Sequence, residues 1–429
     1  MVDYVKTILY FRSFIRCMRK SLLLLIFLSI SVALSYSQVR DLKYYLDQGF
    51  KNNPSLQDYR NQILINHSDS QLLVAKQKPY LEGVGQFMYA PVFGDIGYDN
   101  VITNGGLFQT QVKVSQPILN RKTKEGEYRR LGIEGKSLQN SLALSALQLK
   151  HDISEKYILA CADFDFLQFN QETRKLLQLE KDILKQLADK GFQSQSSYMS
   201  FLMELQGLER QINESNIQFR KDIADLNSSC GIEDTSIRKL ETPSIQTESE
   251  FKTGENPFIR QFYIDSLRIA NSRLIIENHY LPSVNYFADA GILSSQLSNI
   301  SKSLGISFGL NLGIPIFDWH QKKIQVDQIS IEEDTRLHYK NYFFYQRQQE
   351  LSKLRNELSE IEESINLFSQ QKESTDQMVH SARQMLDAGT MPITDYLFML
   401  RNYRELGFSL NQVKYRKLQL INDLNYFHW

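Results

Sequence analysis

One short motif in this 429-residue chain has the spacing of a hydrolytic site. Residues 305–309, Gly-Ile-Ser-Phe-Gly, fit the Gly-x-Ser-x-Gly pattern, in which a serine oxygen attacks a carbonyl carbon. That chemistry requires a sharp turn between a strand and a helix, because the turn exposes the serine oxygen. Here Ser307 lies within alternating polar and apolar residues, which indicate an extended strand. We therefore expect no catalytic role for Ser307, and a secreted serine hydrolase is the least favoured of three functions.

Metal, cofactor and nucleic-acid sites are not indicated either. The seven histidines are scattered, and no His-x-x-x-His or Cys-x-x-Cys pair of the kind that binds zinc occurs. No glycine-rich phosphate loop is present, so any energy that the protein needs must come from a partner. Lys and Arg together number 49, as do Asp and Glu, and a chain of zero formal charge lacks the basic excess that binds nucleic acid. We expect a protein that is not an enzyme and has no cofactor.

Four sequence features occur twice, in the same order. The pairs are Asn53-Pro54 and Asn256-Pro257, Pro79 and Pro282, Pro117 and Pro315, and Gly191 and Gly389. The members of the first two pairs are 203 positions apart, and those of the last two pairs are 198 apart. The spacing within each half is therefore kept, apart from one loop deletion. This regularity indicates an internal duplication.

The duplication predicts the domain organisation. We expect a signal peptide at 1–37, a first structural repeat at 38–231, a linker at 232–255 and a second repeat at 256–429. The linker is assigned from its mixed polar composition, which includes a proline and a glycine.

The signal peptide is assigned from its charge and hydropathy. Three basic residues precede the apolar run Leu22–Leu34, and the small residues Ser35 and Ser37 follow at the expected cleavage site. The run has about 13 residues, which is short for a membrane-spanning helix, so a signal is favoured over an N-terminal anchor. Met18 is an alternative start to Met1.

Each repeat is expected to begin with a helix and to continue with a β-hairpin, at 79–117 and at 282–315. Every second residue of 304–314 is apolar, and glycine, serine and asparagine lie between. This period of two predicts a strand with one apolar face. The residues expected to contact lipid on that face are Phe308, Leu310 and Leu312.

A long helical hairpin is expected after each β-hairpin. Neither 118–190 nor 316–388 contains a proline, and apolar residues recur there in steps of three and four, which is coiled-coil spacing. We expect the chain to reverse near Gly191 and near Gly389 and then to return as a second helix.

These elements favour a membrane channel. A four-stranded sheet with an apolar face and two unpaired edges is not stable in lipid until it closes on itself. Strands of this length suit a transmembrane barrel, and three copies would give twelve strands. The polar helices belong in water, on the periplasmic side. The alternative is a soluble periplasmic coiled-coil scaffold or adaptor protein.

The rare cysteine and tryptophan residues are expected to pack rather than to bind a partner. Cys161 and Cys230 lie at different distances from the predicted reversal, and the mismatch of about 13 Å along the helices exceeds disulfide reach. Trp319 and Trp429 are considered as interfacial anchors, but packing is the preferred interpretation.

The order and spacing of these motifs resemble the TolC family of outer-membrane efflux proteins over essentially the whole mature sequence. The opening residues up to Asn53-Pro54, the strand exits 116–119 and 314–317, and the segment 389–397 are similar to family motifs. The resemblance implies a homotrimer with a twelve-stranded β-barrel, a periplasmic helical barrel and an equatorial region. It also implies an outer-membrane exit duct for efflux or type I secretion, which works with a periplasmic adaptor protein and an inner-membrane transporter.

The same resemblance implies two sites at the ends of the helical hairpins. Asp395 matches a family aspartate that lines the closed periplasmic end, although Phe398 stands where the next family acid is usual and Ser197 is the counterpart in the first repeat. The alternative for Asp395 is an exposed helix-cap or surface acid. The residues implied in adaptor docking are Gly191, Phe192, Ser197, Gly389, Thr390 and Asp395. The alternative there is a turn without a partner.

Overall fold

The computed structural model describes residues 40–91, 93–98, 106–118, 121–234, 240–247 and 256–428. The predicted signal peptide, part of the loop between the first two strands and part of the linker lie outside these ranges, as do Cys17 and Trp429. Within them, no helix has an apolar stretch long enough to cross a membrane.

Contacts group the chain into two compact units, and each unit takes residues from both repeats. The hairpin unit comprises Met1–Asn53, Leu149–Thr247 and Arg355–Asp423. The sheet unit comprises Pro54–Gln148, Glu248–Leu354 and Leu424–Trp429. The two repeats are therefore interleaved, and neither one is a compact body of its own.

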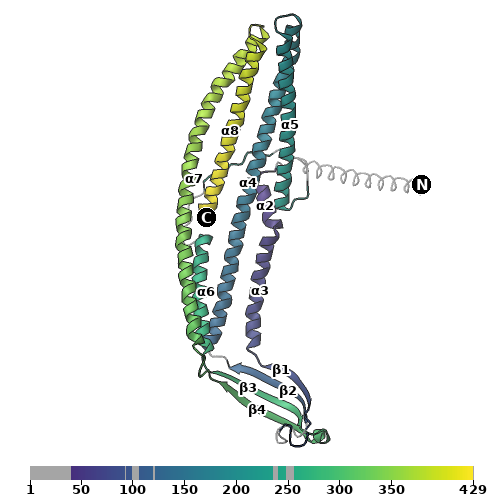
Figure 1. The fold of residues 1–429 in the computed structure, drawn as a ribbon, viewed down its shortest axis with the longest axis vertical. Helices are drawn as coiled ribbons and strands as arrows, with labels where there is room; N and C mark the ends of the chain where they lie inside the picture. The colour runs from purple at the N-terminus through teal and green to yellow at the C-terminus, as the bar shows by residue number, and fades with distance from the viewer. Residues whose placement is uncertain are drawn as a thin grey trace, which may run out of the picture. The chain divides into compact units, whose positions relative to one another are not determined.

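The sheet unit contains one antiparallel sheet in the order β1-β2-β3-β4 (Figure 1). The strands are β1 Tyr80–Tyr89, β2 Gly106–Ile118, β3 Ser283–Ser294 and β4 Leu304–Gly313, with the short 3-10 helix η1 Leu297–Lys302 between the last two. The four predicted strands are confirmed. The pairing of β2 with β3 joins the β-hairpin of the first repeat to the β-hairpin of the second.

The register of the sheet gives it one apolar and one polar face. Phe308 pairs with Ala288, Ala288 with Val114, and Val114 with Leu81, so these four side chains lie on the same face. This apolar row therefore crosses all four strands.

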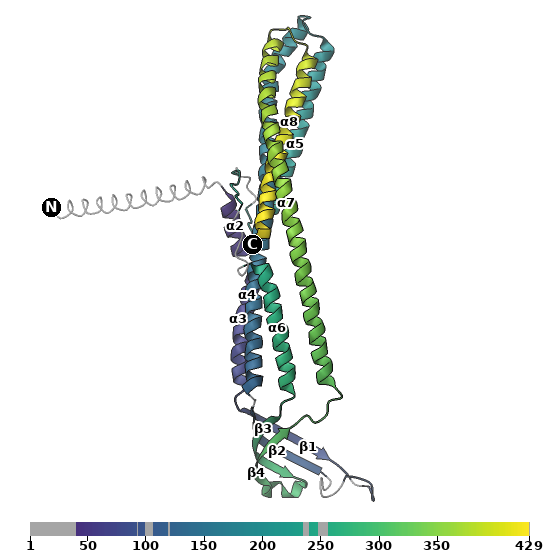
Figure 2. The ribbon, with the colours of Figure 1, turned by 90° about the vertical axis from the view of Figure 1, so that its left-hand side faces the viewer.

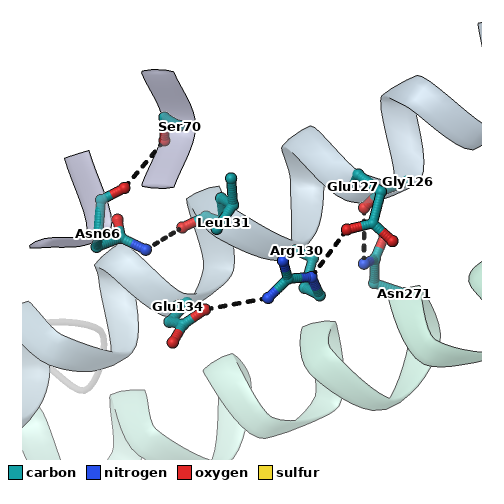
Figure 3. A network of polar contacts seen from close by, with 8 residues as sticks. All are labelled: Asn66, Ser70, Gly126, Glu127, Arg130, Leu131, Glu134 and Asn271. Carbon is teal, nitrogen blue, oxygen red and sulfur yellow. Dashed lines mark hydrogen bonds and ion pairs between the residues drawn. The ribbon is translucent and has the colours of Figure 1, made fainter. Parts of the chain in front are cut away.

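Three helical segments of the sheet unit pack together through asparagine side chains. The helices are α3 Pro54–Lys76, α6 Pro257–His279 and the first part of α4 Arg121–Asp189. Asn66 of α3 donates to the main-chain oxygen of Leu131 at 3.2 Å, and Asn271 of α6 donates to that of Gly126 at 3.1 Å (Figure 3). Figure 2 shows α3 and α6 lying along α4 in this unit. Main-chain oxygens of one helix thus fix the position of two others.

The hairpin unit is built from long antiparallel helices. It holds the later parts of α4 and of α7 Gln321–Asp387, together with α2 Leu42–Asn52, α5 Gln195–Cys230 and most of α8 Ile393–His428. Buried residues of α5 recur in steps of three and four from Tyr198 to Leu226, which is the spacing of coiled-coil packing. On α4, Ile153 and Tyr157 are fully buried, in agreement with the predicted apolar stripe.

A glycine lies at one close helix contact of the hairpin unit. A Cβ atom on Gly49 of α2 would lie 2.2 Å from Cδ1 of Ile153, so a larger residue there would require the end of the Ile153 side chain to move. Cys161 and Cys230 are buried free thiols, as expected from the sequence. Their burial raises the pKa of the Cys161 thiol to about 12 and that of Cys230 to about 11.

Candidate functional site

The two reversals of the hairpin unit have the same backbone geometry. Gly191 and Gly389 both adopt positive φ, +79° and +70°, which side chains disfavour. The N–H of Gly191 donates to the oxygen of Ala188 at 3.0 Å, and the N–H of Gly389 donates to that of Leu386 at 2.9 Å. Each bond of the first reversal is therefore repeated 198 positions later. Figure 1 shows the two reversals at the same end of the hairpin unit.

A single side chain links the two reversals. The amide nitrogen of Gln193 donates to the main-chain oxygen of Met391 at 2.8 Å, and its oxygen accepts from the N–H of Ile393 at 3.3 Å. At the first reversal, Ser194 caps α5 by accepting from the N–H of Ser197 at 3.1 Å. The first N–H groups of a helix have no acceptor within that helix. The Gln193 side chain supplies an acceptor at the start of α8, as the Ser194 side chain does at the start of α5.

The predicted gate residues lie on the exposed side of α8. Asp395 is in the first helical turn and Phe398 follows three positions later, with 66% of its surface exposed. Ile393, Tyr396 and Leu397 are buried on the opposite side. Residues three apart share a helix face, so Asp395 and Phe398 are neighbours there.

The other predicted tip residues differ in exposure. Phe192 and Thr390 are exposed, and the hydroxyl of Thr390 donates to the main-chain oxygen of Met385 at 2.9 Å. Ser197 is half-buried. Of the two equivalent positions, Ser197 and Asp395, only Asp395 carries a carboxylate.

Sequence reasoning missed a buried polar cluster next to these reversals. Glu180 of α4 is 1% exposed, and its Oε1 accepts from the hydroxyl of Tyr396 at 2.9 Å and lies 3.2 Å from Nε of Arg383. Burial raises the pKa of Glu180, while the Tyr396 hydrogen bond and the Arg383 charge act in the opposite direction. No local motif indicates this contact, because the three residues come from three helices.

The residues predicted to contact lipid are exposed on the sheet. Phe308 is 87% exposed, and Leu310 and Leu312 are also exposed. The hydroxyl of Ser307, on the other face, donates to Oδ2 of Asp289 at 2.7 Å. Ser307 lies in mid-strand and not at a strand-to-helix turn, so the geometry of a serine nucleophile is absent.

A row of polar side chains crosses the face opposite Phe308. Ser307 pairs with Asp289, Asp289 with Lys113, and Lys113 with Glu82. The row alternates in charge, which stabilises neighbouring strands. It places two acids and one base of each chain on the same face.

The comparisons with known proteins bear on the fold. No family model and no curated protein matches the chain. It resembles the solved structure of CusC, described in terms of transmembrane channel formation, with a TM-score of 0.73 and 14% identity over 90% of this chain and 91% of that one. The outer membrane protein VceC from Vibrio cholerae has a TM-score of 0.72 and 14% identity, over 90% and 95% of the two chains. The Campylobacter jejuni CmeC outer membrane channel has a TM-score of 0.71 and 15% identity, over 90% and 85%.

The chain has the fold of the outer-membrane channel proteins. The resemblance to the TolC family that the motifs indicated is thereby confirmed for the fold. The match to the outer-membrane channel fold covers the sheet and the long helices together, because it extends over 90% of the chain.

Proposed function

We propose that this protein is one protomer of a trimeric outer-membrane channel, an exit duct that passively conducts small molecules or proteins from the periplasm to the exterior. The observation that carries the proposal is that an apolar row crosses all four strands on one face of the sheet and a polar, charged row crosses them on the other. Such a sheet suits a barrel wall between lipid and a water-filled lumen.

The two edges of the sheet support the trimer. Among the described strands, β1 and β4 each have only one neighbour, so each leaves one edge unpaired. Unpaired backbone groups are costly in lipid, and pairing β4 of one copy with β1 of the next removes the cost. Three copies give a closed barrel of twelve strands.

The polar row gives the proposed lumen its charge. Glu82, Lys113 and Asp289 lie in register on the face that would line the lumen. Three copies would present six carboxylates and three ammonium groups at this level, which favours cations.

The reversals of the hairpin unit are proposed as the periplasmic end of the duct. Asp395 is exposed in the first turn of α8, and three copies would form a ring of carboxylates that attracts cations and restricts flow. Phe398 would add an apolar ring beside it. The exposed residues of the reversals would dock a periplasmic adaptor, which connects the duct to an inner-membrane transporter.

The soluble scaffold is the second candidate, and the exposed strand face counts against it. A soluble protein rarely exposes a row of large apolar side chains such as Ile306, Phe308 and Leu310, whose exposed fractions all exceed two thirds.

The native mass of the protein extracted in detergent from an outer-membrane fraction tests the proposal. We expect a mass close to three chains, where the full chain is 50.0 kDa. A monomer recovered from the soluble periplasmic fraction would overturn the channel and favour the scaffold.

A further inference from the structure

The segment that connects β4 to α7 exposes three large apolar side chains. Ile316 is 94% exposed and Trp319 is 77% exposed, and Phe317 contacts Trp319 edge to face with ring centroids 4.9 Å apart. The expectation that Trp319 packs into the protein is therefore wrong. We call residues 314–324 the junction.

The junction has an unusual backbone. Trp319 and His320 have φ of +52° and +66°, and among the described residues no other non-glycine residue has positive φ. Asp318 stabilises this turn, because its carboxylate accepts from the N–H of His320 at 3.0 Å and from that of Lys322 at 2.9 Å. A left-handed turn is unfavourable for a bulky residue, so the tryptophan is not explained by the turn alone.

Basic side chains accompany the apolar ones. His320, Lys322 and Lys323 are exposed, and Nζ of Lys322 lies 5.5 Å from the ring centre of Tyr280. Together with Ile316 and Phe317, they line a hollow of about 420 Å³. Aromatic and basic side chains together are typical of the boundary between lipid and water, where lysine reaches lipid phosphates.

The first repeat does not have this combination. Its equivalent positions, 198 residues earlier, read Ile118-Leu119-Asn120-Arg121 and contain no aromatic residue. The repeated architecture can therefore connect a strand to a helix without a tryptophan. The aromatic residues of the junction are therefore not needed to connect the strand to the helix, and we look for another role for them.

We propose that the junction anchors the protein in the headgroup region of a phospholipid surface, at the water boundary of the lipid-facing strand. This inference rests on the proposed function, because the apolar row of β4 leads into the junction: Leu310 and Leu312 are followed, at the same spacing, by Ile314 and Ile316, and all four are exposed. Trp319 lies beyond the end of the strand, at the level where tryptophan is enriched in membrane proteins.

Tryptophan fluorescence tests the depth of the junction. The chain has two tryptophans, so Trp429→Phe leaves Trp319 as the single fluorophore. This variant is reconstituted in phosphatidylethanolamine and phosphatidylglycerol vesicles that contain lipids brominated either near the headgroup or near the chain end. We expect bromine near the headgroup to quench Trp319 about twofold more strongly than bromine near the chain end.

A second variant separates this inference from the proposed function. Phe308→Trp, in a chain that also carries Trp319→Phe and Trp429→Phe, reports on the strand itself. Quenching of Phe308→Trp by deep bromine without quenching of Trp319 overturns the anchor and leaves the barrel. No quenching at either position overturns both. Trp319 that is shielded from lipid bromine and from aqueous iodide, and becomes accessible when the oligomer dissociates, belongs to a contact between copies and also overturns the anchor.

Discussion

The side-chain amide of Gln193 donates to the main-chain oxygen of Met391 at 2.8 Å and so joins the two helical reversals of the hairpin unit. The same amide accepts from the N–H of Ile393, and this second bond fixes its orientation. The first reversal therefore positions the start of α8, the helix that carries Asp395.

Replacing Gln193 should loosen the second reversal. Gln193→Ala removes both hydrogen bonds and leaves the N–H of Ile393 without its side-chain acceptor, at a cost of about 1–2 kcal/mol. Hydrogen exchange at the Ile393 amide should become several-fold faster. Gln195→Ala, a change at an exposed neighbour, is the control and should leave this amide unchanged. Equal exchange in both variants would show that the amide bridge does not hold α8.

Asp395 should control block by divalent cations. If three copies form a carboxylate ring, Asp395→Asn should reduce Mg²⁺ block of single-channel current several-fold, because the ring loses its charge. Asp182→Asn removes the same charge from an exposed position of α4 and should leave block intact. Similar block in wild type and Asp395→Asn would refute the gate.

The neighbouring phenylalanine offers the opposite change. Phe398 lies on the same exposed face of α8 as Asp395, so Phe398→Asp would add a second carboxylate ring. We expect Mg²⁺ to block this variant at several-fold lower concentration than wild type, measured in the same planar bilayers. Weaker Mg²⁺ block than in wild type would contradict the placement of Asp395 and Phe398 on the same face of α8.

The two faces of β4 should respond differently to the same charge. Phe308→Asp places a carboxylate on the apolar face, at a cost of about 2 kcal/mol per copy in lipid, and should strongly reduce the amount of trimer in the outer-membrane fraction. Asn311→Asp introduces the same carboxylate on the polar face of the same strand, opposite Asn285, and should be tolerated. Trimer yield on native gels is the measurement, and equal yields would disprove the assignment of the faces.

A carboxyl pair between α4 and α5 should make stability depend on pH. Burial and the hydrogen bond to Asp222 raise the pKa of Asp163 to about 7 from its ordinary value of 3.8. The folded protein therefore binds a proton that the unfolded chain releases, so stability should fall as pH rises from about 4 to about 7. Since Asp163 is partly exposed, we expect a loss of about 1–2 kcal/mol.

Asp163→Asn should remove this dependence. The free energy of unfolding of the variant, from guanidinium titrations followed by circular dichroism, should change less between pH 5 and pH 8 than that of wild type, by about 1 kcal/mol or more. Asp182→Asn, an exposed acid on the same helix, should keep the wild-type slope. Parallel slopes for all three proteins would mean that the pair does not share a proton.

The strands and reversals could be predicted because their signals are local. The alternation of β4 and the glycines at positive φ depend on neighbouring residues only. The Gln193 bridge and the Glu180 cluster could not be predicted, because each joins residues about 200 positions apart (393 − 193 and 396 − 180) that no spacing rule connects. The exposure of Trp319 could not be predicted for a different reason. Tryptophan occurs both in protein cores and at the boundary between lipid and water, so its presence in the sequence does not distinguish the two.

The pairing of β2 with β3 has a consequence for how the chain acquires its structure. Val114 pairs with Ala288, so the centre of the sheet joins residues 174 positions apart (288 − 114). A two-stranded hairpin is marginal in water, and contacts so distant in sequence form slowly. In the proposed outer-membrane channel, the first repeat would therefore enter the periplasm with the β2 edge unpaired until the second repeat follows. During that interval the chain is exposed to aggregation and proteolysis, and a holding chaperone would have its greatest effect then.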